Sequence, residues 1–203
     1  MFLMMTGNYE NMSVRPKRLR FSVDDYYTMI NLGMLKNVER AEIIDGELIE
    51  TMPIGNAHAS CVKILAEILR DILGKDVTHS VQDPIWLDEY NEPIPDLALL
   101  KRRSDFYRGK APLAEDALLL VEVSDSTLDY DRTRKIPLYA QAGIPEVWLV
   151  NIQAGTIEMH CQPRDYSFAV VKIFRRGDVL VSEVLPDVKI KVDEVLGFEN
   201  LAS

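Results

Sequence analysis

The stretch Ala117–Val123 reads ALLLVEV, and it decides the fold because apolar residues occupy both faces of the strand it would form. Such a strand is typical of the centre of a sheet covered on both sides. Glu122 interrupts the run with a carboxylate. Burial of an unpaired charge is costly, so Glu122 requires a cation, a proton or a place at the strand end.

Two more polar residues accompany this strand. Asp96 follows a proline and opens a short apolar run, and Lys135 follows Glu122 by 13 residues (135 minus 122). If the segment after the strand is helical, Asp131, Lys135 and Tyr139 are spaced four apart and share one face. The pattern predicts two carboxylates and one cation near each other.

Four separated pieces occur in a characteristic order: Pro95-Asp96, Glu122-Val123-Ser124, Lys135 with Tyr139, and Gly143–Val150. Together they resemble the putative restriction endonuclease family, a domain family expanded in cyanobacteria and part of the PD-(D/E)XK nuclease superfamily. The resemblance covers roughly residues 38–152. It implies a restriction-endonuclease-like α/β fold, in which helices flank a mixed central sheet.

One position departs from the superfamily pattern. The usual Glu-x-Lys on one strand is replaced here, because Ser124 stands where the lysine would be. The resemblance implies that the lysine has migrated to the following helix, and Lys135 fits that place. Arg134 is the nearest rival, but neighbours in a helix point about 100° apart.

The resemblance also implies a metal-dependent site. Asp96, Glu122 and the backbone carbonyl of Val123 would hold Mg²⁺ or Mn²⁺, which prefer oxygen ligands and lower the pKa of a bound water. Lys135 would complete the catalytic set by orienting that water and offsetting charge on the phosphate. The predicted activity is endonucleolytic hydrolysis of phosphodiester bonds, in DNA more than in RNA.

Four residues are predicted to support this site: Glu42, His58, Ser124 and Tyr139. The family has an acidic residue and a histidine at positions that match Glu42 and His58. Alternatives stay open for both, since Glu42 could be a solvated carboxylate on an edge strand and His58 a histidine satisfied in the core.

A non-catalytic interpretation also stays open. Asp96 could simply end a loop, and Glu122 with Lys135 could form a buried ion pair without a metal. The net charge of −9 and sequence pI near 4.9 are unusual for a nucleic-acid binder. The second hypothesis is therefore an inactive nuclease fold that binds nucleic acid or protein, which a metal titration would distinguish.

A basic stretch follows the Asp96 segment. Lys101, Arg102 and Arg103 stand close to Tyr107, and we expect this loop to overhang the site, contact phosphates and stack a base on Tyr107. The competing interpretation is an ordinary solvated loop.

Length and composition predict one compact domain, since 203 residues with 47% hydrophobic content can bury a proper core. We expect residues 1–20 to form a poorly ordered arm and residues 21–203 to form a single domain, whose core spans about 38–152. Residues 153–203 predict a β extension that widens the sheet or forms a dimer surface. A homodimer would be the simplest way to cut both strands of a duplex.

Location and local structure complete the expectations. No run reaches the ~18 apolar residues of a membrane span, which predicts a cytoplasmic protein with Cys61 and Cys161 as reduced thiols. The periodicity also predicts a helix capped by Ser22, a hairpin at Asp45-Gly46, and further elements at 57–73, 77–87, 94–100, 118–124, 133–142 and 147–152.

Overall fold

The computed structural model describes residues 18–36, 38, 40–50 and 55–197. Its longer elements are α1 (Val23–Asn31), β1 (Ala41–Ile44), β2 (Glu47–Glu50), α2 (Asn56–Leu73), β3 (Val77–Val81), β4 (Leu97–Lys101), β5 (Ala117–Ser124), α4 (Ile136–Gln141), β6 (Glu146–Asn151), β7 (Thr156–Arg164) and β8 (Ser167–Arg175). The shorter ones are the 3-10 turn η1 (Ala114–Asp116), α3 (Leu128–Tyr130), the π-helical turn η2 (Asp131–Lys135), β9 (Val179–Val181), β10 (Lys189–Lys191) and α5 (Val192–Leu196).

Six strands form the central sheet, in the order β3-β4-β5-β6-β7-β8. Strands β5 and β6 are parallel and the other neighbours are antiparallel, so the predicted mixed sheet is confirmed. The predicted C-terminal extension does widen this sheet, because β7 and β8 continue it, whereas β9 and β10 pair separately.

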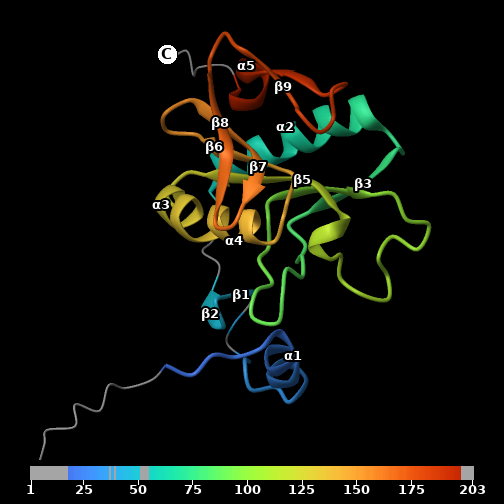
Figure 1. Ribbon diagram of the computed structural model, residues 1–203, viewed down its shortest axis with the longest axis vertical. Coiled ribbons are helices and arrows are strands. Elements are labelled where there is room, and N and C mark those ends of the chain that lie inside the picture. The colour runs from blue at the N-terminus through green and yellow to red at the C-terminus, as the bar shows by residue number, and fades with distance from the viewer. Residues whose placement is uncertain (1–17, 37, 39, 51–54, 198–203) are drawn as a thin grey trace, which may run out of the picture.

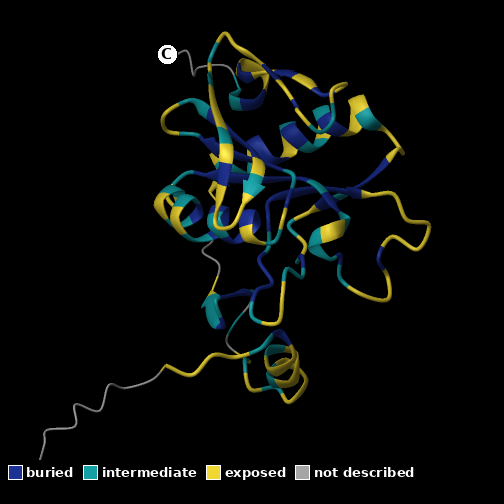
Figure 2. Ribbon diagram, in the orientation of Figure 1, coloured by how far each residue is buried: buried dark blue, intermediate teal, exposed yellow. Residues whose placement is uncertain are grey.

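Helices cover both faces of the sheet, with α2 on one side and α3, η2 and α4 on the other (Figure 1). Leu65 and Leu69 of α2 belong to a core with Val121, while Tyr139 of α4 belongs to a second core with Leu149. Burial therefore follows the central strands, whereas much of α1 is exposed (Figure 2). This two-sided packing explains why β5 is apolar on both faces.

Local chemistry at the N-terminal end matches the sequence signals. Ser22 caps α1, since its Oγ accepts from the Asp25 amide at 3.0 Å while the Asp25 carboxylate accepts from the Ser22 amide at 2.9 Å. Asp45 and Gly46 have φ of 54° and 75°, as a type I′ hairpin turn requires. A Cβ on Gly46 would also lie 2.6 Å from the Cβ of Arg20.

The predicted arm lies largely outside the described residues, which begin at Arg18. Arg18 pairs with Glu47 at 3.2 Å, and Arg20 Nε donates to the Asp45 carbonyl at 2.8 Å. Arg18 and Arg20 therefore lie against the β1–β2 hairpin. The extent of the arm and the domain boundaries stay predictions. No helix in the described part of the chain is long and apolar enough to cross a membrane, and Cys61 and Cys161 are buried free thiols.

Two predicted strands are shorter than expected. Strand β3 ends at Val81 because Gln82 adopts a left-handed conformation with φ of 54°, and its amide donates to the Asp96 carbonyl at 3.1 Å. Strand β4 starts at Leu97, so Asp96 lies just before the strand instead of early in it. Pro137 lies in the first turn of α4, as predicted.

Candidate active site

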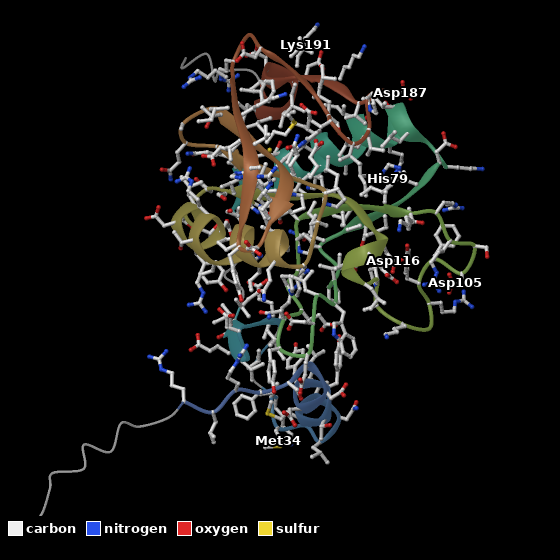
Figure 3. All side chains as sticks on the ribbon, viewed as in Figure 1. Met34, His79, Asp105, Asp116, Asp187 and Lys191 are labelled. Atoms are coloured by element: carbon white, nitrogen blue, oxygen red, sulfur yellow. The ribbon has the colours of Figure 1, made fainter. Side chains whose placement is uncertain are left out.

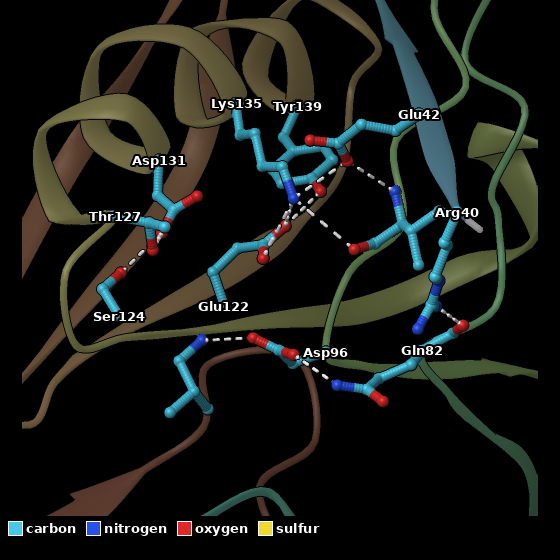
Figure 4. Close-up of polar contacts among 12 residues, drawn as sticks. Arg40, Glu42, Gln82, Asp96, Glu122, Ser124, Thr127, Asp131, Lys135 and Tyr139 are labelled. Atoms are coloured by element: carbon cyan, nitrogen blue, oxygen red, sulfur yellow. Dashed lines mark hydrogen bonds and ion pairs between the residues drawn. The ribbon is translucent and has the colours of Figure 1, made fainter. Parts of the chain in front are cut away.

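Asp96 lies immediately before β4, and Glu122 lies in the neighbouring antiparallel strand β5. Leu97 of β4 faces Val121 of β5, so Asp96 and Glu122 occupy the next pair of positions, close to the C-terminal end of β5. Lys135 reaches Glu122 from the π-helical turn, and Glu42 enters from β1 (Figure 4). Four segments that are distant in sequence therefore meet at one point.

Lys135 is the cation at the centre of this cluster. Its Nζ lies 3.1 Å from Glu42 Oε2 and 3.3 Å from Glu122 Oε1, and it donates to the Ile94 carbonyl at 3.4 Å. Its side chain is only 8% exposed. Burial alone would lower the pKa of Lys135, but the charges of Glu122 and Glu42 outweigh burial and raise it. The amine therefore remains an ammonium ion.

Glu122 is 2% exposed, and its Oε1 accepts from the Tyr139 hydroxyl. Burial raises the pKa of Glu122 well above its usual range; Lys135 partly offsets this, while Asp131 and Asp96 raise it further. Burial and the Glu122 charge likewise raise the pKa of Tyr139. Burial therefore disfavours the carboxylate form of Glu122, and a further cation nearby would favour it.

Asp96 accepts three hydrogen bonds. Its Oδ2 accepts from the Val123 amide at 2.8 Å and faces His58 Nε2 at 3.0 Å, while Oδ1 accepts from Gln82 Nε2 at 3.1 Å. Burial would raise the pKa of Asp96, but His58, the Val123 amide and Gln82 together lower it. The hydrogen bond between His58 and Asp96 also raises the pKa of His58, although the partial burial of the ring would lower it. Val123 therefore contributes its N–H to this contact, and the role of its carbonyl stays a prediction.

Asp131 is a further buried carboxylate, which the sequence placed on the Lys135 face without giving it a function. It is 4% exposed, and its Oδ2 accepts from Ser124 Oγ and Thr127 Oγ1, each at 2.7 Å. Ser124, predicted as a supporting residue, thus reaches the cluster through Asp131.

The cluster is rich in buried carboxylates. Its four carboxylates, each at most 9% exposed, are Glu42, Asp96, Glu122 and Asp131; Lys135 pairs with Glu42 and Glu122, and His58 contacts Asp96. A carboxylate has about four lone-pair sites. The hydrogen bonds above leave acceptor capacity on Asp96 Oδ1 and Glu122 Oε2.

This donor set fits a hard divalent cation. Within the described residues, no three His, Cys, Asp or Glu side chains are grouped so as to hold an ion by themselves. Magnesium, however, usually takes one or two carboxylates and completes its shell with water and phosphate oxygen. Two buried carboxylates with open lone pairs suit that preference.

A second polar cluster lies under the same helical layer. Glu158 of β7 is aligned through Leu149 with Glu122, so both carboxylates point to the same face of the sheet. Glu158 pairs with Arg132, and His160 Nε2 lies 3.3 Å from Glu158 Oε2. Burial lowers the pKa of His160, although the Glu158 charge opposes this.

The basic loop does not lie where we expected. Lys101 ends β4, so the loop leaves the strand at the end opposite Asp96, about 17 Å away for five residues of strand. Asp105, which lies on this loop, projects to one side of the molecule (Figure 3). The prediction that the loop overhangs Asp96 is wrong.

The predicted stacking surface is also covered. Tyr107 is 9% exposed, donates to the Lys101 carbonyl at 2.8 Å and lies beneath the Arg103 guanidinium. Phe106, at 60% exposure and with Arg102 over its ring, is the aromatic residue that this loop presents. Contact of Lys101, Arg102 and Arg103 with nucleic acid stays a prediction, away from the cluster.

Comparison with known proteins agrees with this fold. A family model described as "Putative restriction endonuclease", Uma2, matches residues 23–193. The chain belongs to the Uma2 family. The match extends well beyond the 38–152 region in which the sequence resemblance was recognised.

A solved structure shares the fold of this Uma2 chain. It is a crystal structure of "a putative nuclease belonging to DUF820" from Anabaena variabilis ATCC 29413, with a TM-score of 0.63 and 15% sequence identity. The alignment covers 80% of this chain and 94% of the other. No curated protein matches the sequence. The expected family and fold are thus confirmed.

Gln82 and Arg40 are the neighbours that the sequence gave no reason to choose. Gln82 precedes Asp96 by 14 residues, and its contact depends on the left-handed turn that follows β3. Arg40 donates to the Gln82 carbonyl from the segment before β1 (Figure 4). A positive φ at a glutamine leaves no signal in sequence.

Proposed function

We propose that this Uma2 protein is an endonuclease, dependent on Mg²⁺ or Mn²⁺, that hydrolyses phosphodiester bonds of DNA at the cluster around Lys135. The observation that carries the proposal is the gathering of four buried carboxylates, of which Glu42 and Glu122 share Lys135 and Asp96 contacts His58. A structural ion pair would be balanced, since an uncompensated buried charge is strongly destabilising. Family membership supports the nuclease class.

Asp96 and Glu122 would hold the ion, with the Val123 carbonyl as a third oxygen. When bound, the ion would supply a nucleophilic water at neutral pH and a countercharge for the phosphate. Tyr139 would keep Glu122 oriented through its hydroxyl. His58 and Gln82 would hold Asp96 in place.

Lys135 would act through its charge. Because nearby carboxylates raise its pKa, the ammonium cannot serve as a general base near neutral pH. It can donate hydrogen bonds to the attacking water and stabilise charge that develops on the phosphate. Glu42 would keep the ammonium in the cluster at 3.1 Å while Glu122 serves the ion.

The test is cleavage of supercoiled plasmid with Mg²⁺ or Mn²⁺ by the wild type, Asp96→Asn and Asp83→Asn. Asp83 is an exposed carboxylate one residue after Gln82 and outside the cluster, so it provides a matched control. We expect cleavage by the wild type and by Asp83→Asn, and none by Asp96→Asn. Equal cleavage by Asp96→Asn would overturn the assignment.

An inactive binding module is the second candidate, and the full pairing of Lys135 with two carboxylates favours it. It predicts retention of DNA with no metal uptake. Calorimetric titration with Mn²⁺ beside DNA binding separates the two functions. A cytoplasmic location, a preference for DNA and a homodimer remain predictions.

A further inference from the structure

The π-helical turn η2 is the segment that distributes charged side chains around the cluster. A π-helix is rare and usually appears as a single turn, often at a functional site. The polar residues of this turn bind different parts of the molecule: Asp131 binds Ser124 and Thr127, Arg132 binds Glu158, Arg134 binds Asp45 and Glu47, and Lys135 binds Glu42 and Glu122. The register of this turn decides where Lys135 points.

Asp131 connects the turn to the strand that carries Glu122. Ser124 is the last residue of β5 and lies two positions after Glu122, while Lys135 lies four positions after Asp131. The two-residue step from Glu122 to Ser124 spans about 6.7 Å, and the four-residue step from Asp131 to Lys135, about one helical turn, spans a similar distance. The Ser124–Asp131 and Glu122–Lys135 contacts thus lie side by side between β5 and η2.

The geometry points to Asp131 as a positioning residue. Through its hydrogen bonds to Ser124 and Thr127, it holds η2 in the register in which the Lys135 ammonium reaches Glu122 and Glu42. Lys135 has a flexible four-carbon stem, so its backbone position must be fixed for the ammonium to stay in place. The catalytic consequence rests on the proposed nuclease function, whereas the placement of Lys135 does not.

Conservative substitution separates positioning from a direct role of the charge. Ser124 and Thr127 both donate hydroxyl hydrogens, so the amide oxygen of an asparagine can accept both bonds. Asp131→Asn should keep the register, and Asp131→Ala should lose it. If Asp131 acted as a charged ligand, Asp131→Asn would be as defective as Asp131→Ala.

The experiment measures acetylation of Lys135 by mass spectrometry in the full chain without metal. Lys63, exposed on α2, is the internal reference, and Thr133→Ala is the control from an exposed position of the same turn. We expect protection of Lys135 in the wild type, in Asp131→Asn and in Thr133→Ala. Protection should be lost in Asp131→Ala and in the double variant Ser124→Ala, Thr127→Val, which keeps the expectation testable if Asp131→Ala fails to fold.

Cleavage kinetics supply the second measurement. The kcat of Asp131→Ala should fall about 100-fold, because a small misplacement of a catalytic group is that costly. KM for DNA should stay unchanged, and Asp131→Asn should restore kcat. Unchanged Lys135 protection in both Asp131→Ala and the double variant, or equal defects in Asp131→Ala and Asp131→Asn, would overturn the proposal. If the wild type does not cleave, the proposed function fails, while acetylation still decides the positioning role.

Discussion

The clusters around Glu122 and Glu158 lie under the same helical layer, on the same face of the sheet, yet differ in charge. Glu158 is matched by Arg132, whose side chain is 40% exposed, and by a histidine whose pKa is lowered by burial. Glu122 shares one buried lysine with Glu42. A buried ion pair alone therefore indicates little about function, whereas two buried carboxylates that share one lysine are a candidate functional site.

The largest expected difference between the clusters is in catalysis. Lys135→Met should lower kcat for plasmid cleavage by at least about 100-fold, because it removes charge stabilisation from the phosphate. Arg132→Met removes the cation of the other cluster from the same helical turn and should leave kcat within a few fold. DNA binding in Ca²⁺ provides the control. A comparable loss in both variants would remove the distinction between the clusters.

Stability should change in opposite directions when each carboxylate is neutralised. At pH 8 and without metal, Glu122→Gln should stabilise the chain by about 1–3 kcal/mol, since its raised pKa shows that the charged form is disfavoured in the fold. Glu158→Gln should destabilise by about 1–3 kcal/mol, because Arg132 and His160 lose a charged acceptor. Urea unfolding measures both.

The gain from Glu122→Gln should also disappear near pH 4. There the wild-type carboxyl group is protonated in the folded state and mostly protonated in the unfolded state, where its pKa is about 4.3, so the substitution changes little charge. A stabilisation that persisted at pH 4 would show that packing, and not charge, is responsible.

The two histidines should give opposite pH dependence. The pKa of His58 is raised in the fold, so its contribution to stability is present below about pH 6.5 and is lost as the pH rises through the folded pKa. The pKa of His160 is lowered, so its contribution is present above about pH 6.5 and is lost as the pH falls through the folded pKa. Urea unfolding of the wild type, His58→Gln and His160→Gln between pH 5 and 8 measures this. The difference in unfolding free energy between wild type and variant should change with pH in opposite directions for the two histidines, and a change in the same direction for both would contradict the prediction.

The smallest effect concerns the basic loop. Reversal of charge at Arg102 and Arg103 should reduce the magnitude of the slope of log K for DNA binding against log salt concentration by about 1 to 2, because each phosphate contact contributes about 0.9. The kcat should not change, since the loop leaves β4 at the end opposite Asp96. Filter binding at several salt concentrations measures the slope. Unchanged affinity would mean an ordinary solvated loop.

The sequence predicted the fold wherever local patterns decide the structure. The two-sided apolar pattern around Glu122 indicated a central strand, and Asp45-Gly46 indicated the hairpin. Both depend on side-chain period and turn chemistry, which are local properties. Asp96, Glu122 and Lys135 were likewise brought together as predicted, because a family pattern connected them.

The remainder of the site depends on geometry that leaves no local pattern. Gln82 reaches Asp96 because Gln82 itself adopts a positive φ, and Asp131 accepts from Ser124 and Thr127 at the start of a π-helical turn. The misplaced loop is a different case. The predicted strand already had Asp96 near its start and the loop after its end, and the length of the strand, about 17 Å for five residues, separates the two.

The hydrogen bond from the Val123 amide to Asp96 makes a backbone group dependent on the proposed metal ligand. Val123 lies near the C-terminal end of β5, where its amide would usually donate to a carbonyl of a neighbouring strand; here the amide donates to the Asp96 carboxylate. Hydrogen exchange at this single amide should therefore report on the carboxylate. Any event that draws Asp96 away exposes the amide to solvent, so NMR could follow occupation of the site in the absence of turnover.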